Sequence, residues 1–236
     1  MMPMKNSGFK VLITGTNRGI GLEFVRQYSD AGYRVLACCR DPRKATLLNA
    51  LAASSEGRIS VHALDVSDFS QIERLALELK GQVIDLLINN AGFYPQGYFG
   101  SIDYAAWHKA FQINTMAPMR MVECFVEQVA TSHLRKIVTL SSMMGSIGDN
   151  SSGGSYLYRT SKTAANMVMK NLAVELAPRG IAIATLHPGW VKTDMGGTNA
   201  LITTQQSVAG LCTVIDRLAS DNSGRFIAYD GQEIPW

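Results

Sequence analysis

The chain has 236 residues, of which 47% are hydrophobic and 17% charged, and its formal net charge is +3. This length suits one large domain with a substantial core over residues 1–236. The small net charge and the lack of a dense Lys/Arg run exclude a strongly basic surface, so we expect neither nucleic acid nor an anionic membrane as a partner.

The cysteine pattern and the first residues favour a cytoplasmic location. The four cysteines show neither a C-x-x-C pair nor a framework spacing, which indicates reduced thiols. The first eight residues are too short and polar for a signal peptide and are predicted to be a flexible tail. No apolar run approaches the ~18 residues of a membrane span. The four histidines are scattered, so no metal site is expected.

The first predicted elements are a strand and a helix joined by a glycine-rich turn. Residues 9–14 form a short apolar, β-branched run typical of a buried strand, and the apolar spacing after Gly19 predicts a helix. Glycines in such a turn let a pyrophosphate approach the helix N-terminus, although an ordinary glycine turn is the alternative. The candidate cofactor-binding residues here are Gly15, Asn17, Arg18, Gly19, Ile20 and Gly21.

The second predicted strand, residues 33–39, ends where a dinucleotide fold meets the adenosine ribose. An acid at this place binds a free 2′-hydroxyl, whereas cations accept a 2′-phosphate. Asp41 is a candidate acid, but Asp before proline is also a good N-cap, which explains it locally. The cations Arg40 and Lys44, together with Arg18, favour NADP(H) over NAD(H) as cofactor.

Residues 58–64 predict the third strand, which ends at Asp65 and Val66. These two residues could lie over the adenine edge, or they could be ordinary loop residues. An amphipathic helix follows, with a predicted capping box of Asp68 and Gln71.

The fourth predicted strand, residues 83–88, is followed by small and amide side chains. Asn90, Ala91 and Gly92 could let the backbone lie against the ribose, although the same residues also make a simple turn. An aromatic loop, residues 93–100, comes next.

A helix is predicted to begin near Asp103 and to continue past Pro118. Proline has no N–H, so the carbonyl of Asn114 should lose its helical partner and the helix should kink. The freed carbonyl could hold a water molecule in a proton path from Lys162, or the proline bend could be harmless.

The fifth predicted strand, residues 136–140, ends at Ser141 and Ser142, and a serine hydroxyl there could donate to a carbonyl oxygen. Tyr158 and Lys162 follow on a long helix, four residues apart and therefore on one face. An ammonium about 4 Å from the phenol, at an effective dielectric of ~20, favours the phenolate by roughly 4 kcal/mol. We therefore expect the pKa of the tyrosine to be lowered by up to about three units. An isolated Y-x-x-x-K is more often a surface pair, so the assignment depends on its neighbours.

The remaining elements complete an alternating pattern of strands and helices. Residues 181–186 predict the sixth strand, and after it the backbone at Val191 and the hydroxyl of Thr193 could hold a carboxamide. A helix over 207–218 and a strand over 225–229 follow. Such alternation predicts an α/β fold with a parallel sheet covered on both faces.

Taken together, the motifs resemble the short-chain dehydrogenase/reductase family over essentially the whole chain, and within it the C-factor-like and Sniffer-like carbonyl reductase branch. The matching positions are Thr14-Gly15-x-x-x-Gly19-x-Gly21, Asn89-Asn90-Ala91-Gly92, Asn114, Ser142, Tyr158-x-x-x-Lys162 and Pro188-Gly189. The resemblance implies a single-domain Rossmann-like sheet of seven parallel strands and a homo-oligomer.

The same resemblance implies a role for each catalytic candidate. Tyr158 would be the proton donor, Lys162 its pKa-lowering and ribose-binding partner, Ser142 the carbonyl-orienting hydroxyl and Asn114 the water-holding residue. Pro188 and Gly189 join the cofactor-binding candidates. The interval from Ser142 to Tyr158 is longer than in most of the family, so Ser141 stays an alternative.

The resulting hypothesis is an NADPH-dependent reductase that converts an aldehyde, ketone or quinone to an alcohol. The candidate residues of an apolar substrate pocket are Phe93, Tyr94, Tyr98, Tyr156 and Trp190. The alternative is a dinucleotide-binding signalling or regulatory protein in which catalysis is incidental. Two helices, near residues 119–129 and 167–176, are apolar beyond one face and predict a homo-oligomer, either a dimer or a tetramer.

Overall fold

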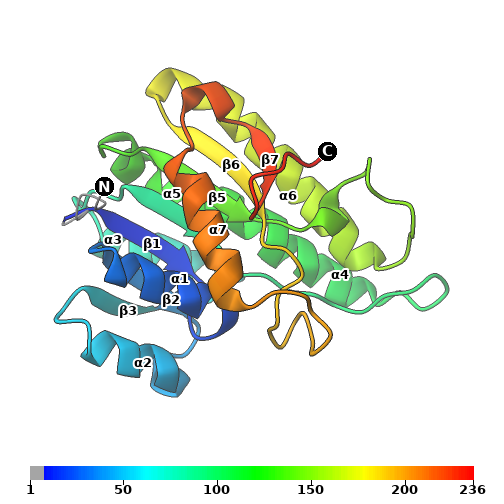
Figure 1. Cartoon of the computed structure of the whole chain (residues 1–236), viewed down its shortest axis with the longest axis horizontal. Coiled ribbons are helices and arrows are strands. Elements are labelled where there is room, and N and C mark those ends of the chain that lie inside the picture. Colours follow the sequence, from blue (N-terminus) through cyan, green and yellow to red (C-terminus); the bar gives the residue numbers. More distant parts are fainter. Residues whose placement is uncertain (1–7) are drawn as a thin grey trace.

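The computed structural model describes residues 8–236, so all of the predicted tail except Gly8 lies outside the described residues. In this part of the chain seven strands form one parallel sheet: β1 (Lys10–Thr14), β2 (Arg34–Cys39), β3 (Ile59–Ala63), β4 (Leu86–Asn89), β5 (Lys136–Leu140), β6 (Ala182–His187) and β7 (Arg225–Ala228). Their order across the sheet is β3-β2-β1-β4-β5-β6-β7 (Figure 1). The predicted Rossmann-like, doubly wound α/β fold is confirmed.

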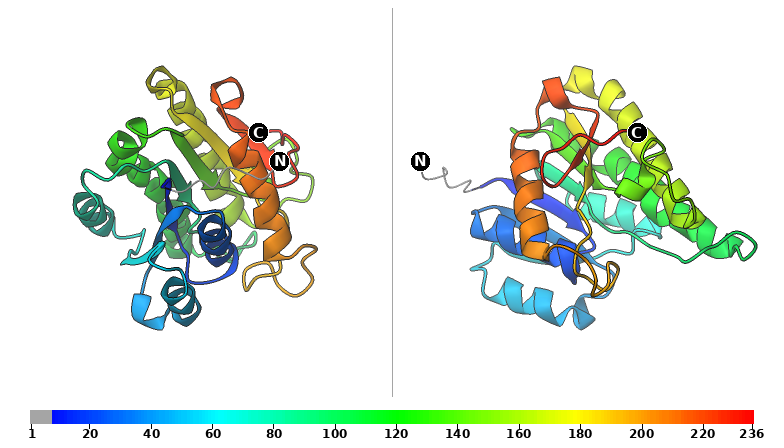
Figure 2. Two further views of the ribbon diagram at one scale, coloured as in Figure 1. Left: turned by 60° about the vertical axis from the view of Figure 1, so that its left-hand side comes forward. Right: turned by 45° about the vertical axis from the view of Figure 1, so that its right-hand side comes forward.

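Helices cover both faces of this sheet, as Figure 2 shows. They are α1 (Gly19–Asp30), α2 (Thr46–Ala53), α3 (Phe69–Glu78), α4 (Tyr104–Phe111), α5 (Ala117–Ala130), α6 (Tyr156–Glu175) and α7 (Thr204–Asp216). Helices α1, α2 and α7 contribute side chains to one hydrophobic cluster, and helices α3, α5 and α6 contribute to another. Strand β1 shows why both clusters are needed: Val11 and Ile13 belong to the first and Leu12 to the second, because successive strand residues point to opposite faces.

The strand order reverses between β1 and β4, and this reversal creates the crevice in which α/β sheets bind ligands. Strand β1 pairs with both of these neighbours: Ile13 lies opposite Ile88 of β4, and Thr14 lies opposite Cys38 of β2. The loops that leave these parallel strands therefore meet at one edge of the sheet. The glycine-rich turn after β1 and the Asn90–Gly92 segment after β4 lie side by side there, because the amide of Asn90 donates to the hydroxyl of Thr14 at 3.0 Å.

Near Pro118, where a kink is predicted, the residues Gln112–Met116 form a π-helical turn between α4 and α5. The N–H of Ala117 bonds the carbonyl of Gln112, five residues earlier, instead of four. Pro118 follows directly and has no N–H to continue the regular ladder. The wider turn brings Thr115 against α6, where its hydroxyl donates to the carbonyl of Ser161 at 2.8 Å.

Two local predictions need correction. Asp68 caps α3 by accepting from the N–H of Ser70, but Gln71 accepts from the N–H of Asp65, so the predicted reciprocal capping box is wrong. The last helix begins at Thr204, earlier than predicted, because Thr203 and Gln206 form a capping box there.

Among the described residues, no helix combines the length and the apolar character needed to cross a membrane.

Candidate active site

Tyr158 and Lys162 lie together on the buried face of α6, as their spacing predicts. Their exposed fractions are only 7% and 4%. The Lys162 Nζ donates to the carbonyl oxygen of Leu140, the last residue of β5, at 2.7 Å, and it lies 5.8 Å from the centroid of the Tyr158 ring. The pair is therefore fixed at the carboxyl edge of the sheet, beside the point where the strand order reverses.

Burial dominates the electrostatics of this pair. It lowers the pKa of Lys162 to about 8 and raises the pKa of Tyr158 above its ordinary value, while a hydrogen bond with the Ser142 side chain acts in the opposite direction on the phenol. The predicted lowering of the Tyr158 pKa is therefore wrong in this structure, because burial of the phenol raises its pKa more than the Ser142 side chain lowers it. The phenol of the free protein therefore stays protonated at neutral pH.

The two serines after β5 point in different directions. The hydroxyl of Ser141 donates to the Asn166 Oδ1 at 2.6 Å and is buried in the protein. The side chain of Ser142 lies next to the Tyr158 phenol, whose pKa it lowers, and its hydroxyl accepts from the N–H of Met144 at 3.2 Å. Ser142 is thus the serine that shares the site with the tyrosine.

The side chain of Asn114 clamps two parts of the site. Its Oδ1 accepts from the N–H of Phe93, and its Nδ2 donates to the carbonyl of Phe93, both at 2.8 Å. The same Nδ2 donates to the hydroxyl of Ser161 on α6 at 2.9 Å. A Cβ on Gly92 would lie 3.6 Å from Asn114 Oδ1 and 3.8 Å from Lys162 Nζ, so the asparagine and the lysine converge on this glycine.

The glycine-rich turn after β1 forms a cradle that larger residues would fill. Gly15 and Gly19 have φ values of +71° and +56°, in the left-handed region that favours glycine. A Cβ on Gly21 would lie 2.1 Å from the carbonyl oxygen of Gly15. The Asn90 Nδ2 donates to the carbonyls of Thr14 and Gly15 at 2.8 and 3.0 Å, which locks the turn against the loop after β4. The residues present therefore fit a pyrophosphate at the start of α1.

The cations predicted near a 2′-phosphate lie around the end of β2. Arg40 is exposed, and no salt bridge among residues 8–236 involves it. Asp41 instead caps the following turn and lies 3.4 Å from Arg43 and 3.8 Å from Lys44, so its carboxylate is already paired. Arg18 pairs with Asp194 at 2.9 Å, and both side chains are exposed.

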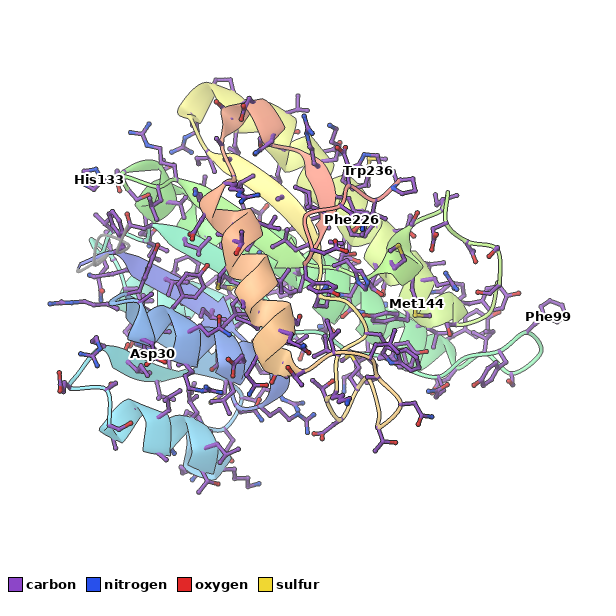
Figure 3. The ribbon with its side chains drawn as sticks, in the orientation of Figure 1. Asp30, Phe99, His133, Met144, Phe226 and Trp236 are labelled. Carbon is purple, nitrogen blue, oxygen red and sulfur yellow. The ribbon has the colours of Figure 1, made fainter. Side chains whose placement is uncertain are left out.

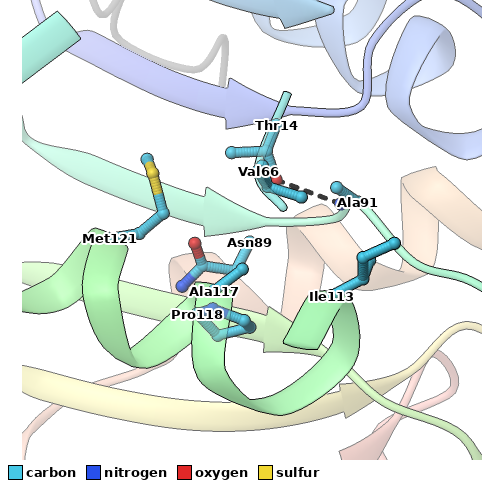
Figure 4. Close-up of a pocket in the computed structure, with 8 residues that line it drawn as sticks. All are labelled: Thr14, Val66, Asn89, Ala91, Ile113, Ala117, Pro118 and Met121. Atoms are coloured by element: carbon cyan, nitrogen blue, oxygen red, sulfur yellow. Dashed lines mark hydrogen bonds between the residues drawn. The ribbon is translucent and has the colours of Figure 1, made fainter. Parts of the chain in front are cut away.

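The adenine-side candidates are held by their own loops. The carboxylate of Asp65 accepts from the N–H and the hydroxyl of Ser67, at 2.9 and 2.7 Å. Val66 is buried and lines a small cavity at the tips of β1 and β4 (Figure 4). The other residues that line this cavity are Thr14, Asn89, Ala91, Ile113, Ala117, Pro118 and Met121.

The loop after β6 returns to the glycine-rich turn. A Cβ on Gly19 would lie 3.3 Å from Cγ2 of Thr193, so the predicted carboxamide-binding segment touches the predicted pyrophosphate site. Gly189 has a φ of +83°, and the carbonyl of Pro188 accepts from the hydroxyl of Ser207. Val191 is buried.

Of the five aromatic pocket candidates, Tyr94 is the one whose ring contacts Tyr158, with centroids 4.5 Å apart. Tyr98, Tyr156 and Trp190 are 61%, 39% and 51% exposed, and Phe93 lies under the ammonium of Lys109 at 5.4 Å. The structure therefore separates these five predicted residues: the half-buried Tyr94 contacts Tyr158, Tyr156 begins α6, and the other three lie in loops.

The sequence analysis missed residues that fix the site from behind. Asn166 accepts from Ser141 and donates to the carbonyl of Gly145, which ties α6 to the turn after β5. Its position one turn after Lys162, on the same buried helix face, was an available signal. Arg159 donates to the carbonyls of Gly153 and Met144, and no spacing rule indicated this contact.

Two distant segments also support the turn after Ser142. The His187 Nδ1 accepts from the N–H of Met143 at 3.2 Å, and burial lowers the pKa of His187 to about 4, so the neutral ring can accept. The carbonyl of Trp236 accepts from the N–H groups of Ile147 and Gly148 at 3.0 and 2.8 Å. Figure 3 shows Trp236 beside Phe226 of β7, and their rings stack 5.7 Å apart.

The geometry can be compared with known proteins. The chain matches the family model of short chain dehydrogenases over residues 10–201. It is 42% identical to C-signal of Myxococcus xanthus over 156 residues, which cover 65% of this chain and 93% of that protein. Carbonyl reductase Sniffer of D. melanogaster has a similar structure, with a TM-score of 0.92, 32% identity and coverage of 99% of this chain and 100% of that chain.

A second solved structure, an NADPH-bound carbonyl reductase from chicken fatty liver, is similar with a TM-score of 0.91 and 32% identity over 98% of this chain and 100% of that one. The family match covers most of residues 8–236, and the matched range contains the glycine-rich turn, Tyr158 and Lys162. The chain therefore belongs to the short-chain dehydrogenase family of oxidoreductases, in the branch that includes C-signal and the Sniffer-like carbonyl reductases.

Proposed function

We propose that the protein reduces the carbonyl group of an aldehyde, ketone or quinone to an alcohol, with NADPH as the cofactor. The observation that carries this proposal is the buried Tyr158 phenol, which lies beside Lys162 and has Ser142 as a side-chain neighbour at the edge of the sheet. The similarity to two carbonyl reductases, one of them NADPH-bound, supports the same reaction.

In the proposed reaction the chain supplies the proton and the orientation. A bound nicotinamide supplies the hydride that is transferred to the carbonyl carbon. Ser142 donates to the carbonyl oxygen and orients it, and Tyr158 gives that oxygen its proton as the alcohol forms. The Lys162 ammonium, next to the phenol, is the source that restores the proton to Tyr158. Asn114 holds the segment beside Lys162 and, through its main chain, is the proposed site of a water molecule in this path.

The residues around the glycine-rich turn support a dinucleotide. Gly15, Asn17, Arg18, Gly19, Ile20 and Gly21 would hold the pyrophosphate, and Asn90, Ala91 and Gly92 would face the ribose. Asp65 and Val66 would face the adenine, and Pro188, Gly189, Val191 and Thr193 would face the carboxamide. Arg40 is the free cation best placed for a 2′-phosphate, because the acid next to it, Asp41, is already paired.

A second candidate function is signalling or regulation by the dinucleotide-bound protein, and the 42% identity to C-signal is the observation that favours it. In that case binding of the dinucleotide, and not turnover, would carry the biological effect. A Tyr158→Phe variant that binds the dinucleotide, turns over no substrate and still restores the phenotype of a deletion strain would support this second candidate.

We also propose a cytoplasmic homo-oligomer. The four cysteines are free, as in a reducing compartment. An open groove of about 500 Å³ lies on the surface of α3, the π-helical turn, α5 and α6, where Met116 is 46% exposed. The residues that line it are Phe69, Glu73, Thr115, Met116, Met119, Arg120, Glu123 and Val168. Apolar side chains in such a groove favour a second copy as the partner.

Replacing Tyr158 by Phe should lower kcat for carbonyl reduction about 10²–10⁴-fold, because the general acid is lost. Stopped assays of NADPH oxidation with a panel of aldehydes, ketones and quinones measure this change. Tyr104→Phe is the matched control, since Tyr104 lies on another helix, α4, and is 73% exposed, and it should keep full activity. Full turnover by Tyr158→Phe would contradict the proposed function.

The rate of reduction should fall as the pH rises through about 8. The pKa of Lys162 is lowered to about 8 in the folded protein, so its ammonium persists below that pH and is lost above it. Reduction consumes a proton, and each pH unit above this value should therefore lower kcat about tenfold. Steady-state kinetics between pH 6 and 10 tests this, and a rate that stays constant to pH 10 would rule out Lys162 as the proton source.

Replacing Arg40 by Ala should raise KM for NADPH about tenfold or more and leave KM for NADH unchanged, because a charge-assisted hydrogen bond to the 2′-phosphate contributes about 1.5–3 kcal/mol. Arg43→Ala is the control, since that guanidinium pairs with Asp41. An equal rise in KM for NADPH and for NADH would show that Arg40 does not bind the 2′-phosphate.

Sedimentation velocity at micromolar concentration should show a dimer or larger species, and Met116→Glu should shift it towards monomer by placing a charge in the groove. Leu47→Glu is the control, because Leu47 is 66% exposed on α2, which lies on another part of the surface (Figure 1). A wild-type protein that sediments only as a monomer would refute the homo-oligomer.

A further inference from the structure

Tyr94 has two contacts that no spacing rule indicated. Its ring meets the ring of Tyr158 edge to face, with an interplanar angle of 71° and centroids 4.5 Å apart. Its hydroxyl lies 3.2 Å from the hydroxyl of Ser155. Tyr94 therefore touches both the proposed proton donor and the residue at the start of the helix that carries it.

The backbone next to Tyr94 is fixed by hydrogen bonds from the side chain of Asn114. The clamp of Asn114 on Phe93 satisfies both polar groups of that residue, so the neighbouring Tyr94 has little freedom to move. The half-buried Tyr94 thus directly follows a clamped residue, and its hydroxyl lies beside Ser155 at the start of α6. Phe99, by contrast, extends into solvent at the end of the same loop and is 90% exposed (Figure 3).

Ser155 is unusual as the first residue before α6. It has a left-handed φ of +45°, and its hydroxyl makes no capping bond to the helix. Its carbonyl accepts from the N–H groups of Tyr158 and Arg159, at 3.1 and 3.0 Å. Serine normally caps a helix with its hydroxyl, so here that hydroxyl is turned to Tyr94 at the expense of the cap.

The geometry of a phenol makes this side contact important. Rotation of the ring about its own long axis leaves the hydroxyl oxygen in place, whereas a swing at χ1 moves it by several ångströms. The hydroxyl of Tyr158 must stay within hydrogen-bond reach of Ser142, and a displacement of about 1 Å can cost a catalyst roughly 10²-fold in rate. A ring packed edge-on against Tyr158 restricts that swing.

We propose that Tyr94 is a positioning residue, whose ring holds the Tyr158 side chain in the rotamer that directs its hydroxyl towards Ser142. This inference rests on the proposed carbonyl reduction. It assigns Tyr94 to the proton-transfer step and not merely to the wall of the substrate pocket. Ser155 and Asn114 act on the same step through Tyr94, by fixing its hydroxyl and its backbone.

The test uses three variants of the full chain, with NADPH and a small aldehyde that the wild type reduces. Tyr94→Ala removes the ring and should lower kcat at least tenfold, with KM for the aldehyde and Kd for NADPH within about twofold of wild type. Tyr94→Phe keeps the ring and should restore kcat to within about threefold. Phe99→Ala is the matched control, since Phe99 lies in the same loop but is 90% exposed, and it should behave as wild type.

Three outcomes would overturn the proposal. A rise in KM with unchanged kcat for Tyr94→Ala would make Tyr94 a pocket wall only. Equal losses in Tyr94→Phe and Tyr94→Ala would assign the effect to the Ser155 contact and not to the ring. A crystal structure of Tyr94→Ala with Tyr158 in its wild-type rotamer would refute the positioning role whatever the activity.

The crystal structure also separates this proposal from the function on which it rests. If Tyr158→Phe retains full turnover, carbonyl reduction by this site fails, whereas the rotamer of Tyr158 in Tyr94→Ala still reports directly on the ring contact. Circular dichroism and NADPH fluorescence verify that each variant is folded and binds the cofactor.

Discussion

The buried ammonium of Lys162 is the constraint on which the arrangement of the site depends. An amine that is 4% exposed needs a partner, and the carbonyl of Leu140 supplies it at 2.7 Å. This bond fixes α6 against the end of β5, and it thereby sets the height of Tyr158 above the sheet edge. Burial also keeps the phenol protonated, so the same packing that holds the pair together sets its chemistry.

The element pattern could be derived from the sequence because each strand is a short apolar run and each helix has an apolar face. The run over Val11, Leu12 and Ile13 is apolar at every position, because helices cover both faces of the sheet at this strand. The boundaries were harder to predict where side-chain capping decides them. Thr203 begins α7 through a capping box that the sequence analysis did not identify, and Gln71 bonds Asp65 instead of completing one.

The site was only partly accessible to sequence reasoning. The spacing of Tyr158 and Lys162 gave their common face, but it could not give their burial, and burial reversed the expected direction of the tyrosine pKa. The choice between Ser141 and Ser142 likewise required the structure, because the hydroxyl of Ser141 is bonded to Asn166, which lies on α6 one turn after Lys162. Contacts such as that between Tyr94 and Ser155 join loops 61 residues apart, and no local pattern encodes them.

The strand order also governs how the chain reaches its native state. Strand β1 lies in the middle of the sheet, and Lys10 bonds Asp85, which is 75 residues further along the chain. Such non-local pairing has a high contact order, which slows folding since loop closure must precede the contacts that offset its entropy. The edge of the sheet that carries Tyr158 and Lys162 combines segments from the first strand to the last residues described. Its geometry therefore depends on long-range contacts that only the completed sheet provides.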